Sequence, residues 1–279
     1  MKRLPSAAAV LISAFAMAIA QDAGPGKLII VPDRHKTIQA ALNHAEAGDT
    51  VFVRSGTYRE SVTMPEGVAL IGTSSEHTIL TGDRNNPVVR GAQGATIRHV
   101  TIENGYIGIQ CANAFMVIED CVIRGNRETG IHSVIALPVI RNNILMRNRG
   151  SGIFCETARS SRGFIANNVI AENGQSGVML AGQTEALIEN NVFYFNKQYG
   201  VFAAEGARRS RIINNLLYGN RSAGNAVAVI DRSNIFDDPG HKVASWDAPP
   251  AVVLRGRGRE GADIGLVKRT FYRPAVRLE

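Results

Sequence analysis

Short apolar stretches and single polar residues alternate in a fixed order along the middle of this chain. One unit reads Ile140-Arg-Asn-Asn-Ile-Leu, then a lone Asn148, then Gly152-Ile153, and variants of it recur from residue 118 onward. The lone Asn occupies five positions: Asn126, Asn148, Asn173, Asn196 and Asn220. The following Gly keeps the same spacing: Gly130, Gly152, Gly177, Gly200 and Gly224. Length variation is therefore confined to one part of each 22–25-residue unit, as in solenoids.

The apolar runs are two to four residues long, rich in β-branched side chains, and interrupted by Asn and Gly. They predict short strands separated by tight turns. Stacking such units forms parallel sheets with ~4.8 Å between coils. The sequence thus predicts an all-β, single-stranded parallel β-helix. The Asn column should form a ladder of side-chain amides, and the Gly column should supply positive φ. An earlier, degenerate coil spans 97–109, with Asn104 and Gly108 in the same register.

The ends of the chain extend this pattern. The segments 37–42, 47–51 and 56–60, and near the C-terminus 234–239 and 261–265, are similar to the opening and exit of right-handed parallel β-helices of the pectate-lyase-like superfamily. The resemblance implies a right-handed solenoid with an N-terminal capping α-helix. The residues themselves agree, because four apolar positions share one helical face and Gly48 is placed as a C-cap. Those positions are Ile38, Ala41, Leu42 and Ala45.

Four segments are predicted. Residues 1–20 have the layout of a signal peptide: Lys2 and Arg3, then an apolar run to Ala20 that is shorter than a membrane span. An uncleaved anchor is the alternative. Residues 21–66 form the N-terminal cap and first coil, 67–235 the β-helix repeats, and 236–279 a C-terminal tail or cap. We therefore expect a secreted or periplasmic protein with no membrane span after signal cleavage.

Composition and net charge restrict the classes of partner that the protein is expected to bind. The chain has 279 residues, 45% hydrophobic and 20% charged, which excludes a disordered class. Net charge is +7; without Lys2 and Arg3 it is +5, which suits an acidic ligand and is too small to indicate nucleic acid. The three cysteines, Cys111, Cys121 and Cys155, show no CxxC spacing. Cys111 and Cys155 should lie two coils apart, too far for a disulfide, so all three are expected to be buried thiols.

Because strands alternate, one residue per coil in the strand after each Gly should point outward. These residues are Gln110, His132, Phe154, Met179 and Phe202. Phe154, Met179 and Phe202 suggest an apolar platform for sugar rings, with His132 and Glu156 at its edge. The alternative is that the C-terminal tail or a loop between coils covers this stripe.

A basic column follows the Asn ladder: Arg127, Arg149, Gly174, Lys197 and Arg221. Stacked one per coil, it forms a positive stripe beside the outward column. This arrangement suits an acidic polysaccharide whose carboxylates repeat along the chain. The alternative is an ordinary solvated turn face.

The resemblance also implies tests for activity. Glycoside hydrolases of this fold carry paired aspartates before the Gly strand, whereas here only Glu128 is acidic. The aspartates of pectin methylesterases are likewise missing, although Gln110 is suitably placed. A polysaccharide lyase remains. Its base would come from Arg127, Arg149 or Lys197, or from His132, the only histidine of the repeat strands, with Ca²⁺ held by Glu128 and Glu156.

The predicted function is therefore an exported β-helix protein that binds an acidic polysaccharide, with lyase-type β-elimination as the candidate reaction if it is catalytic. His132, Arg127 and Arg149 are the catalytic candidates, and no residue is assigned as a ligand of a permanent metal. The binding candidates are Gln110, Phe154, Glu156, Met179, Lys197 and Phe202. The alternative is a non-catalytic structural or surface-interaction β-helix. A periplasmic assembly factor, as among copper-enzyme maturation proteins with similar repeats, lacks a supporting Met/His cluster. The sequence leaves the oligomeric state open.

Overall fold

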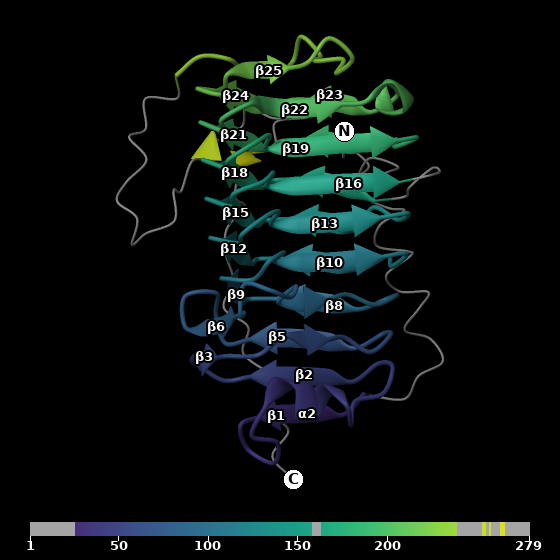
Figure 1. Cartoon of the computed structure of the whole chain (residues 1–279), viewed down its shortest axis with the longest axis vertical. Coiled ribbons are helices and arrows are strands. Elements are labelled where there is room, and N and C mark those ends of the chain that lie inside the picture. The colour runs from purple at the N-terminus through teal and green to yellow at the C-terminus, as the bar shows by residue number, and fades with distance from the viewer. Residues whose placement is uncertain (1–25, 158–162, 239–252, 255–256, 258–262, 266–279) are drawn as a thin grey trace, which may run out of the picture.

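A computed structural model of the chain describes residues 26–157, 163–238, 253–254, 257 and 263–265. The predicted signal peptide lies outside these residues, and the four segment boundaries stay predictions. The described chain winds into a right-handed parallel β-helix with three sheets of nine, eight and eight strands (Figure 1). Each coil contributes one strand to each sheet, so the predicted solenoid is confirmed.

Sheet A contains β1 (Leu28–Val31), β2 (Thr50–Val53), β5 (Ala69–Gly72), β8 (Thr96–Arg98), β11 (Val117–Glu119), β14 (Val139–Arg141), β17 (Phe164–Ala166), β20 (Leu187–Glu189) and β23 (Arg211–Ile213). Sheet B contains β3 (Gly56–Tyr58), β6 (Thr78–Thr81), β9 (Thr101–Glu103), β12 (Val122–Arg124), β15 (Ile144–Met146), β18 (Val169–Ala171), β21 (Val192–Tyr194) and β24 (Leu216–Tyr218). Sheet C contains β4 (Val62–Thr63), β7 (Val89–Arg90), β10 (Ile109–Ala112), β13 (Ile131–Val134), β16 (Ile153–Thr157), β19 (Val178–Gly182), β22 (Tyr199–Ala203) and β25 (Ser222–Gly224).

The core is built from inward columns that run the length of the solenoid. Sheet A supplies fully buried isoleucines coil after coil, from Ile97 through Ile140 to Ile188. Sheet B supplies Ile123, then Leu145 and their successors. Because equivalent residues stack directly, a column can be filled by one side-chain type, and the short apolar runs of the sequence suffice for a continuous core.

Two Asn ladders hold the turns of the coils. The predicted ladder from Asn126 to Asn220 is confirmed, with each Nδ2 donating to the next Oδ1 at 2.9–3.1 Å. A second ladder runs parallel to it between sheets A and B, with the same spacing of 2.9–3.1 Å. Its members are Asn143, Asn168, Asn191, Asn215 and Asn234. Nearly all these amides are buried, so every bond satisfies groups that water does not reach.

Two expectations about the turns are wrong. First, the Gly column does not adopt positive φ; that conformation belongs to the residue before each ladder Asn, such as Arg147 or Glu172. Gly is required instead by close approach, because a Cβ on Gly130 would lie 2.6 Å from the carbonyl oxygen of Gly152. Second, Asn104 does not extend the ladder.

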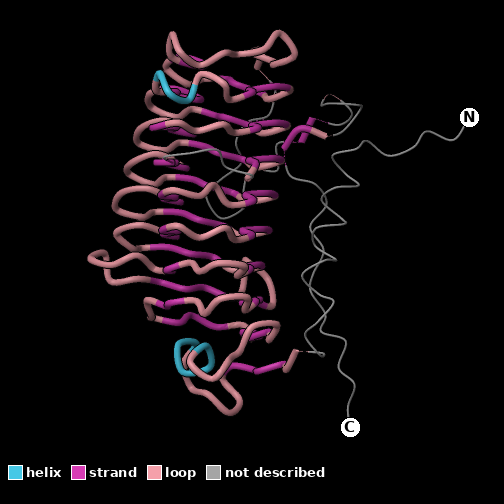
Figure 2. The backbone as a smooth tube through the Cα atoms, turned by 90° about the vertical axis from the view of Figure 1, so that its right-hand side faces the viewer, coloured by secondary structure: helices cyan, strands magenta, loops and turns pink. Residues whose placement is uncertain are grey.

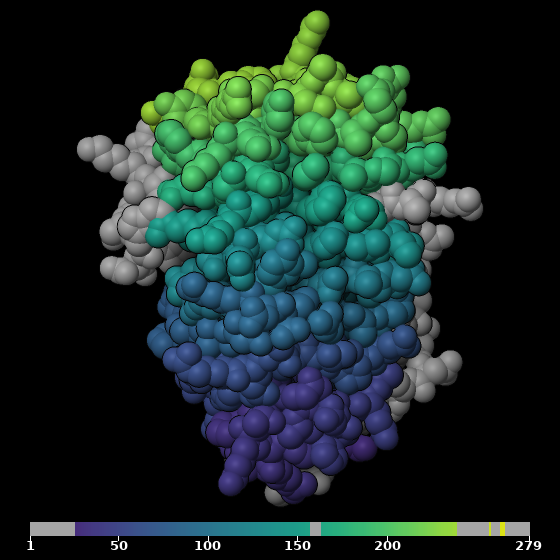
Figure 3. Space-filling view, in the orientation of Figure 1, coloured from purple at the N-terminus to yellow at the C-terminus, as the bar shows by residue number. Residues whose placement is uncertain are grey.

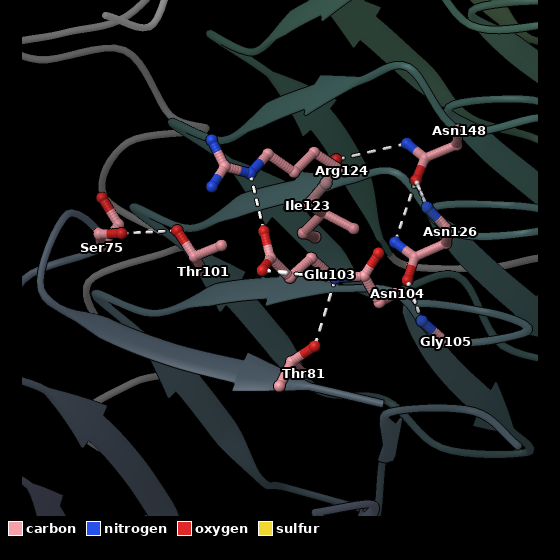
Figure 4. Close-up of polar contacts among 10 residues, drawn as sticks. All are labelled: Ser75, Thr81, Thr101, Glu103, Asn104, Gly105, Ile123, Arg124, Asn126 and Asn148. Atoms are coloured by element: carbon pink, nitrogen blue, oxygen red, sulfur yellow. Dashed lines mark hydrogen bonds and ion pairs between the residues drawn. The ribbon is translucent and has the colours of Figure 1, made fainter. Parts of the chain in front are cut away.

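The ladder begins at Asn126, because the residue that lies beneath Asn126 is Gly105 and not Asn104. Arg124 pairs with Glu103 in register, so Gly105 lies beneath Asn126 and donates its N–H to Asn126 Oδ1 at 3.0 Å (Figure 4). Asn104 takes positive φ and its side chain bonds to Thr81. The unit is 21 residues long across sheet B and 22 across sheet C at this coil, so counting from the Gly placed Asn104 wrongly.

The N-terminal helix is shorter than expected. Helix α2 (Ile38–Leu42) packs Ile38, Ala41 and Leu42 into the core, as predicted, and Ala45 packs against it from the following turn. The helix ends at Asn43, so Gly48 is not its C-cap. Figure 2 shows α2 and the 3₁₀ segment η1 (Glu205–Ala207) near opposite ends of the stack.

The described part of the C-terminal segment returns to sheet B. Strands β26 (Val253–Leu254) and β27 (Ile264–Gly265) pair with each other. Ile264 is fully buried in a cluster on the outer surface of sheet B. The Asn167 side chain donates to the carbonyls of Asp263 and Gly265, at 2.9 and 3.1 Å. This piece of the tail therefore covers sheet B and not the outward column of sheet C.

Candidate functional site

The predicted outward column exists on sheet C. Gln110, His132, Phe154, Met179 and Phe202 pair in register across five neighbouring strands, β10 to β22. All five are half-buried, whereas the residues on either side of each face the core. Alternation along a strand explains this, because successive side chains point to opposite faces. Figure 3 shows successive coils as bands of colour, so neighbouring coils together build each lateral surface.

The column continues downward to a residue that sequence reasoning missed. Arg90 on β7 lies directly below Gln110 and donates from Nη1 to Gln110 Oε1 at 2.8 Å. The signal was weak because the coil containing Val89-Arg90 lacks the Asn and Gly of the later repeats. The exposed Arg90 guanidinium places a positive charge within the column itself.

His132 occupies the middle of this column and has two neighbours on the next coil. Its Nε2 is buried, has no hydrogen-bond partner among the described residues, and lies 3.5 Å from Glu156 Oε2. Its ring is parallel to that of Phe154 within 6°, with centroids 4.9 Å apart. Parallel rings with this centroid separation form an offset stack. One face of Phe154 is therefore covered, and a sugar ring would meet the edge of this stack.

The remaining apolar members lie on the next two coils. Phe202 pairs in register with Met179 and contacts Tyr199, with ring centroids 5.7 Å apart and a tilt of 50°. Tyr199 is the second residue that the sequence analysis did not include. The face thus has a polar part from Arg90 to His132 and an apolar part from Phe154 to Phe202.

The basic stripe also exists. Arg127, Arg149, Lys197 and Arg221 are exposed, and none forms an ion pair within the described part of the chain. The gap at Gly174 has a steric cause, since a Cβ there would collide with the carbonyl oxygen of Arg149.

Two arginines that precede the ladder Asn residues behave differently. Arg124 bonds to Glu103 at 2.9 Å, and Arg147 bonds to Glu172 at 3.2 Å. The four cations of the stripe therefore differ from these arginines in having no anionic partner among the described residues.

The two acidic residues predicted to hold Ca²⁺, Glu128 and Glu156, do not lie close to each other. Glu128 precedes strand β13, whereas Glu156 pairs with Val134 at the end of that strand. The strand alone separates them by about 10 Å. Across residues 26–157 and 163–238 and the short described pieces of the tail, no group of three or more His, Cys, Asp or Glu residues could hold a metal ion.

The inward side chains of sheet C, directly behind the outward column, include two thiols that are unreactive at neutral pH. Cys111, Ser133 and Cys155 form one inward column, and all three cysteines of the chain are buried thiols outside any disulfide, as predicted. Burial raises the pKa of Cys111 to about 12 and raises that of Cys155 as well, so both thiols stay protonated at neutral pH. Any chemistry must therefore come from the outer face.

The described residues contain no helix with the length and apolar character needed to cross a membrane. A curated relative, mannuronan C5-epimerase AlgE3 from Azotobacter vinelandii, is 25% identical over 207 residues. The match covers 69% of this chain but only 11% of the relative's length.

Among solved structures, a pectin methylesterase in complex with a hexasaccharide has a TM-score of 0.51 at 10% identity, covering 77% of this chain and 94% of that one. An alginate lyase from Paenibacillus sp. str. FPU-7 has a TM-score of 0.49 at 13% identity, covering 76% and 98%. At such identities the likeness concerns the fold. A family model described as right handed beta helix region matches residues 88–238, more than half of the chain. This protein therefore belongs to the right-handed β-helix family.

Proposed function

We propose that this protein is exported and binds an acidic polysaccharide along the outer face of sheet C, where His132 promotes β-elimination. The observation that carries the proposal is the row of four exposed, unpaired cations stacked beside a column of polar and aromatic side chains. Coil spacing of ~4.8 Å repeats these charges at about the length of one sugar residue. The similarity to a mannuronan C5-epimerase supports a polyuronate ligand.

The reaction needs a base and a neutralised carboxylate. A base removes the proton from C5 of a uronate, the electrons form the C4–C5 double bond, and the C4–O4 bond breaks, with O4 gaining a proton. His132 is the base in this proposal. Glu156 faces its Nε2, so the other ring nitrogen is the one directed to substrate. Arg127 and Arg149 stabilise the carboxylate whose charge spreads during proton removal.

In this proposal Ca²⁺ is bound mainly by the polysaccharide and not by the protein. Glu128 and Glu156 lie too far apart to share an ion, so a bound Ca²⁺ would take most of its oxygen ligands from uronate carboxylates. We expect added Ca²⁺ to strengthen retention on the polymer, and a chelator to reverse this without unfolding the protein.

The experiment measures binding and elimination together on polyuronates. The unsaturated uronate product absorbs in the ultraviolet, and retention on the immobilised polymer reports binding. Arg149→Gln with Lys197→Gln should weaken binding about tenfold at low salt, with less effect at high salt. Arg211→Gln is the matched control, because Arg211 is an exposed cation on sheet A.

Three outcomes separate the readings. Product formation that His132→Ala abolishes supports the lyase. Retention with no product, in wild type and variants alike, overturns the catalytic part and leaves the non-catalytic interaction protein. Absence of retention on every polymer overturns the proposal as a whole.

A further inference from the structure

The sheet C column changes character halfway along the solenoid. Arg90, Gln110 and His132 occupy three consecutive coils, and Phe154, Met179 and Phe202 occupy the next three. The switch is abrupt, because the His132 ring stacks directly on Phe154. A polymer lying along this column would meet hydrogen-bonding groups on one half and none on the other.

The basic stripe does not follow this change. Arg127 belongs to the coil of His132, Arg149 to the coil of Phe154, and Lys197 to the coil of Phe202. The apolar half therefore keeps cations beside its first and third coils, with a gap at Gly174 on the coil of Met179 and the exposed carboxylate of Glu156 on the strand of Phe154. A ligand that fits this half must be anionic along one edge and apolar across the face that meets Met179.

An unmodified uronate chain satisfies only one of these demands. Its carboxylates can reach the stripe, but its hydroxyls would lose water against Phe and Met side chains that return no hydrogen bond. O-acyl esters change this, because they replace hydroxyl donors with methyl groups and leave the carboxylate charged. We propose that the apolar half of sheet C binds O-acylated residues of an acidic polysaccharide, an inference that rests on the function proposed above.

An anionic membrane surface has the same two chemistries but fits less well. Phe154, Met179 and Phe202 are half-buried, and none belongs to the exposed large apolar residues of the described chain. Membrane-binding faces insert protruding apolar side chains below the headgroups. A flat sheet with sunken side chains suits a chain that lies along it.

The test compares one acetylated polyuronate with the same preparation after mild alkaline deacetylation, which keeps charge and length constant. Burying one acetyl methyl group strengthens binding about fourfold, so two or more should give about tenfold preference for the acetylated form. Met179→Gln keeps the side-chain length but removes its apolar character, and should reduce this preference to less than about threefold. Leu187→Gln is the matched control, because Leu187 is a half-buried outward residue on sheet A of the same coil.

The inference and the proposed function fail differently. Equal binding of both polymers, with Met179→Gln changing neither, overturns the acyl site and leaves polysaccharide binding intact. No binding of either polymer overturns the proposed function and this inference with it. Binding to vesicles of phosphatidylglycerol but to neither polymer replaces both with a membrane-surface role. A tenfold preference that Met179→Gln removes and Leu187→Gln preserves supports the site.

Discussion

The outer faces of sheet B and sheet C are built from the same kind of repeat position, yet they end in opposite states. On sheet B the outward residues from β15 to β21 are apolar and closed, with Ile144, Val169 and Val192 fully buried and Ile264 packed among them. On sheet C the outward residues are half-buried, and they include an imidazole nitrogen with no hydrogen-bond partner. The chain supplies its own cover for one face, while the other carries exposed charges that a ligand can use, such as Arg90 and Glu156.

The two faces contribute to different properties, sheet B to the stability of the fold and sheet C to binding and catalysis. An apolar outward column costs free energy unless something excludes water from it, and on sheet B a segment about a hundred residues away in sequence does so. On sheet C the ion pairs and stacks are exposed enough to contribute little to folding. We therefore expect changes on sheet B to lower stability, and changes on sheet C to alter binding and catalysis.

The largest effect should come from the cover of sheet B. Ile264→Ala removes a fully buried side chain and should lower the free energy of unfolding by about 3 kcal/mol, with Ile264→Val costing about 1 kcal/mol. Urea unfolding followed by circular dichroism measures both. Polyuronate binding by the folded protein should stay unchanged. A loss below about 1 kcal/mol for the Ala variant would show that Ile264 does not close this face.

A smaller effect of opposite sign is expected at the corner between sheets A and B. Asp120 takes positive φ, as Asn142 and Asn167 do on later coils, but its Oδ1 is buried without a hydrogen-bond partner. Burial raises the pKa of Asp120, and neighbouring Glu119 adds to this, so the folded state disfavours the carboxylate. Asp120→Asn should stabilise the protein by about 1 kcal/mol at neutral pH.

The pH dependence of this stability difference tests whether charge burial at Asp120 is its cause. A raised folded pKa penalises the wild type above that pKa, and the penalty disappears as pH falls towards the unfolded value near about 4. The stability difference between Asp120→Asn and wild type should therefore shrink on acidification, as thermal unfolding across this range would show. A difference that stays constant with pH would contradict the assignment to charge burial.

The smallest stability effect is expected on sheet C. The Glu156 side chain is 58% exposed, so Glu156→Gln should change the free energy of unfolding by less than about 0.5 kcal/mol. The same variant should slow β-elimination about tenfold, because His132 loses the carboxylate that faces its Nε2. A large destabilisation with unchanged activity would contradict the view that sheet C contributes to activity and not to stability.

Much of this arrangement could be predicted because repetition makes sequence spacing a direct measure of position. The Asn ladder from Asn126 and the outward column from Gln110 to Phe202 are confirmed in register. Prediction failed where a coil departs from the pattern. Asn104 lies one place off because the unit shortens across sheet B, and Arg90 was missed because its coil carries neither marker residue.

The glycine column shows a second kind of limit. The repetition of Gly130 and its equivalents was visible, but its cause was taken to be backbone conformation. The cause is contact with the next coil, where the carbonyl oxygen of Gly152 leaves no room for a Cβ. A spacing that repeats from coil to coil shows that a position is constrained. The physical cause of that constraint depends on neighbours that lie a full coil away.

The solenoid, the ladder and the side chains that stack on each face could be predicted from the residues alone, because these features follow from a period of 22–25 residues and the alternation of a strand. Tertiary structure alone decided which outward face is closed, where the ladder begins, and that His132 points one nitrogen at Glu156 while stacking on Phe154. Those features depend on contacts between coils and on the return of the chain's end to sheet B, and neither is encoded in the spacing of any single repeat.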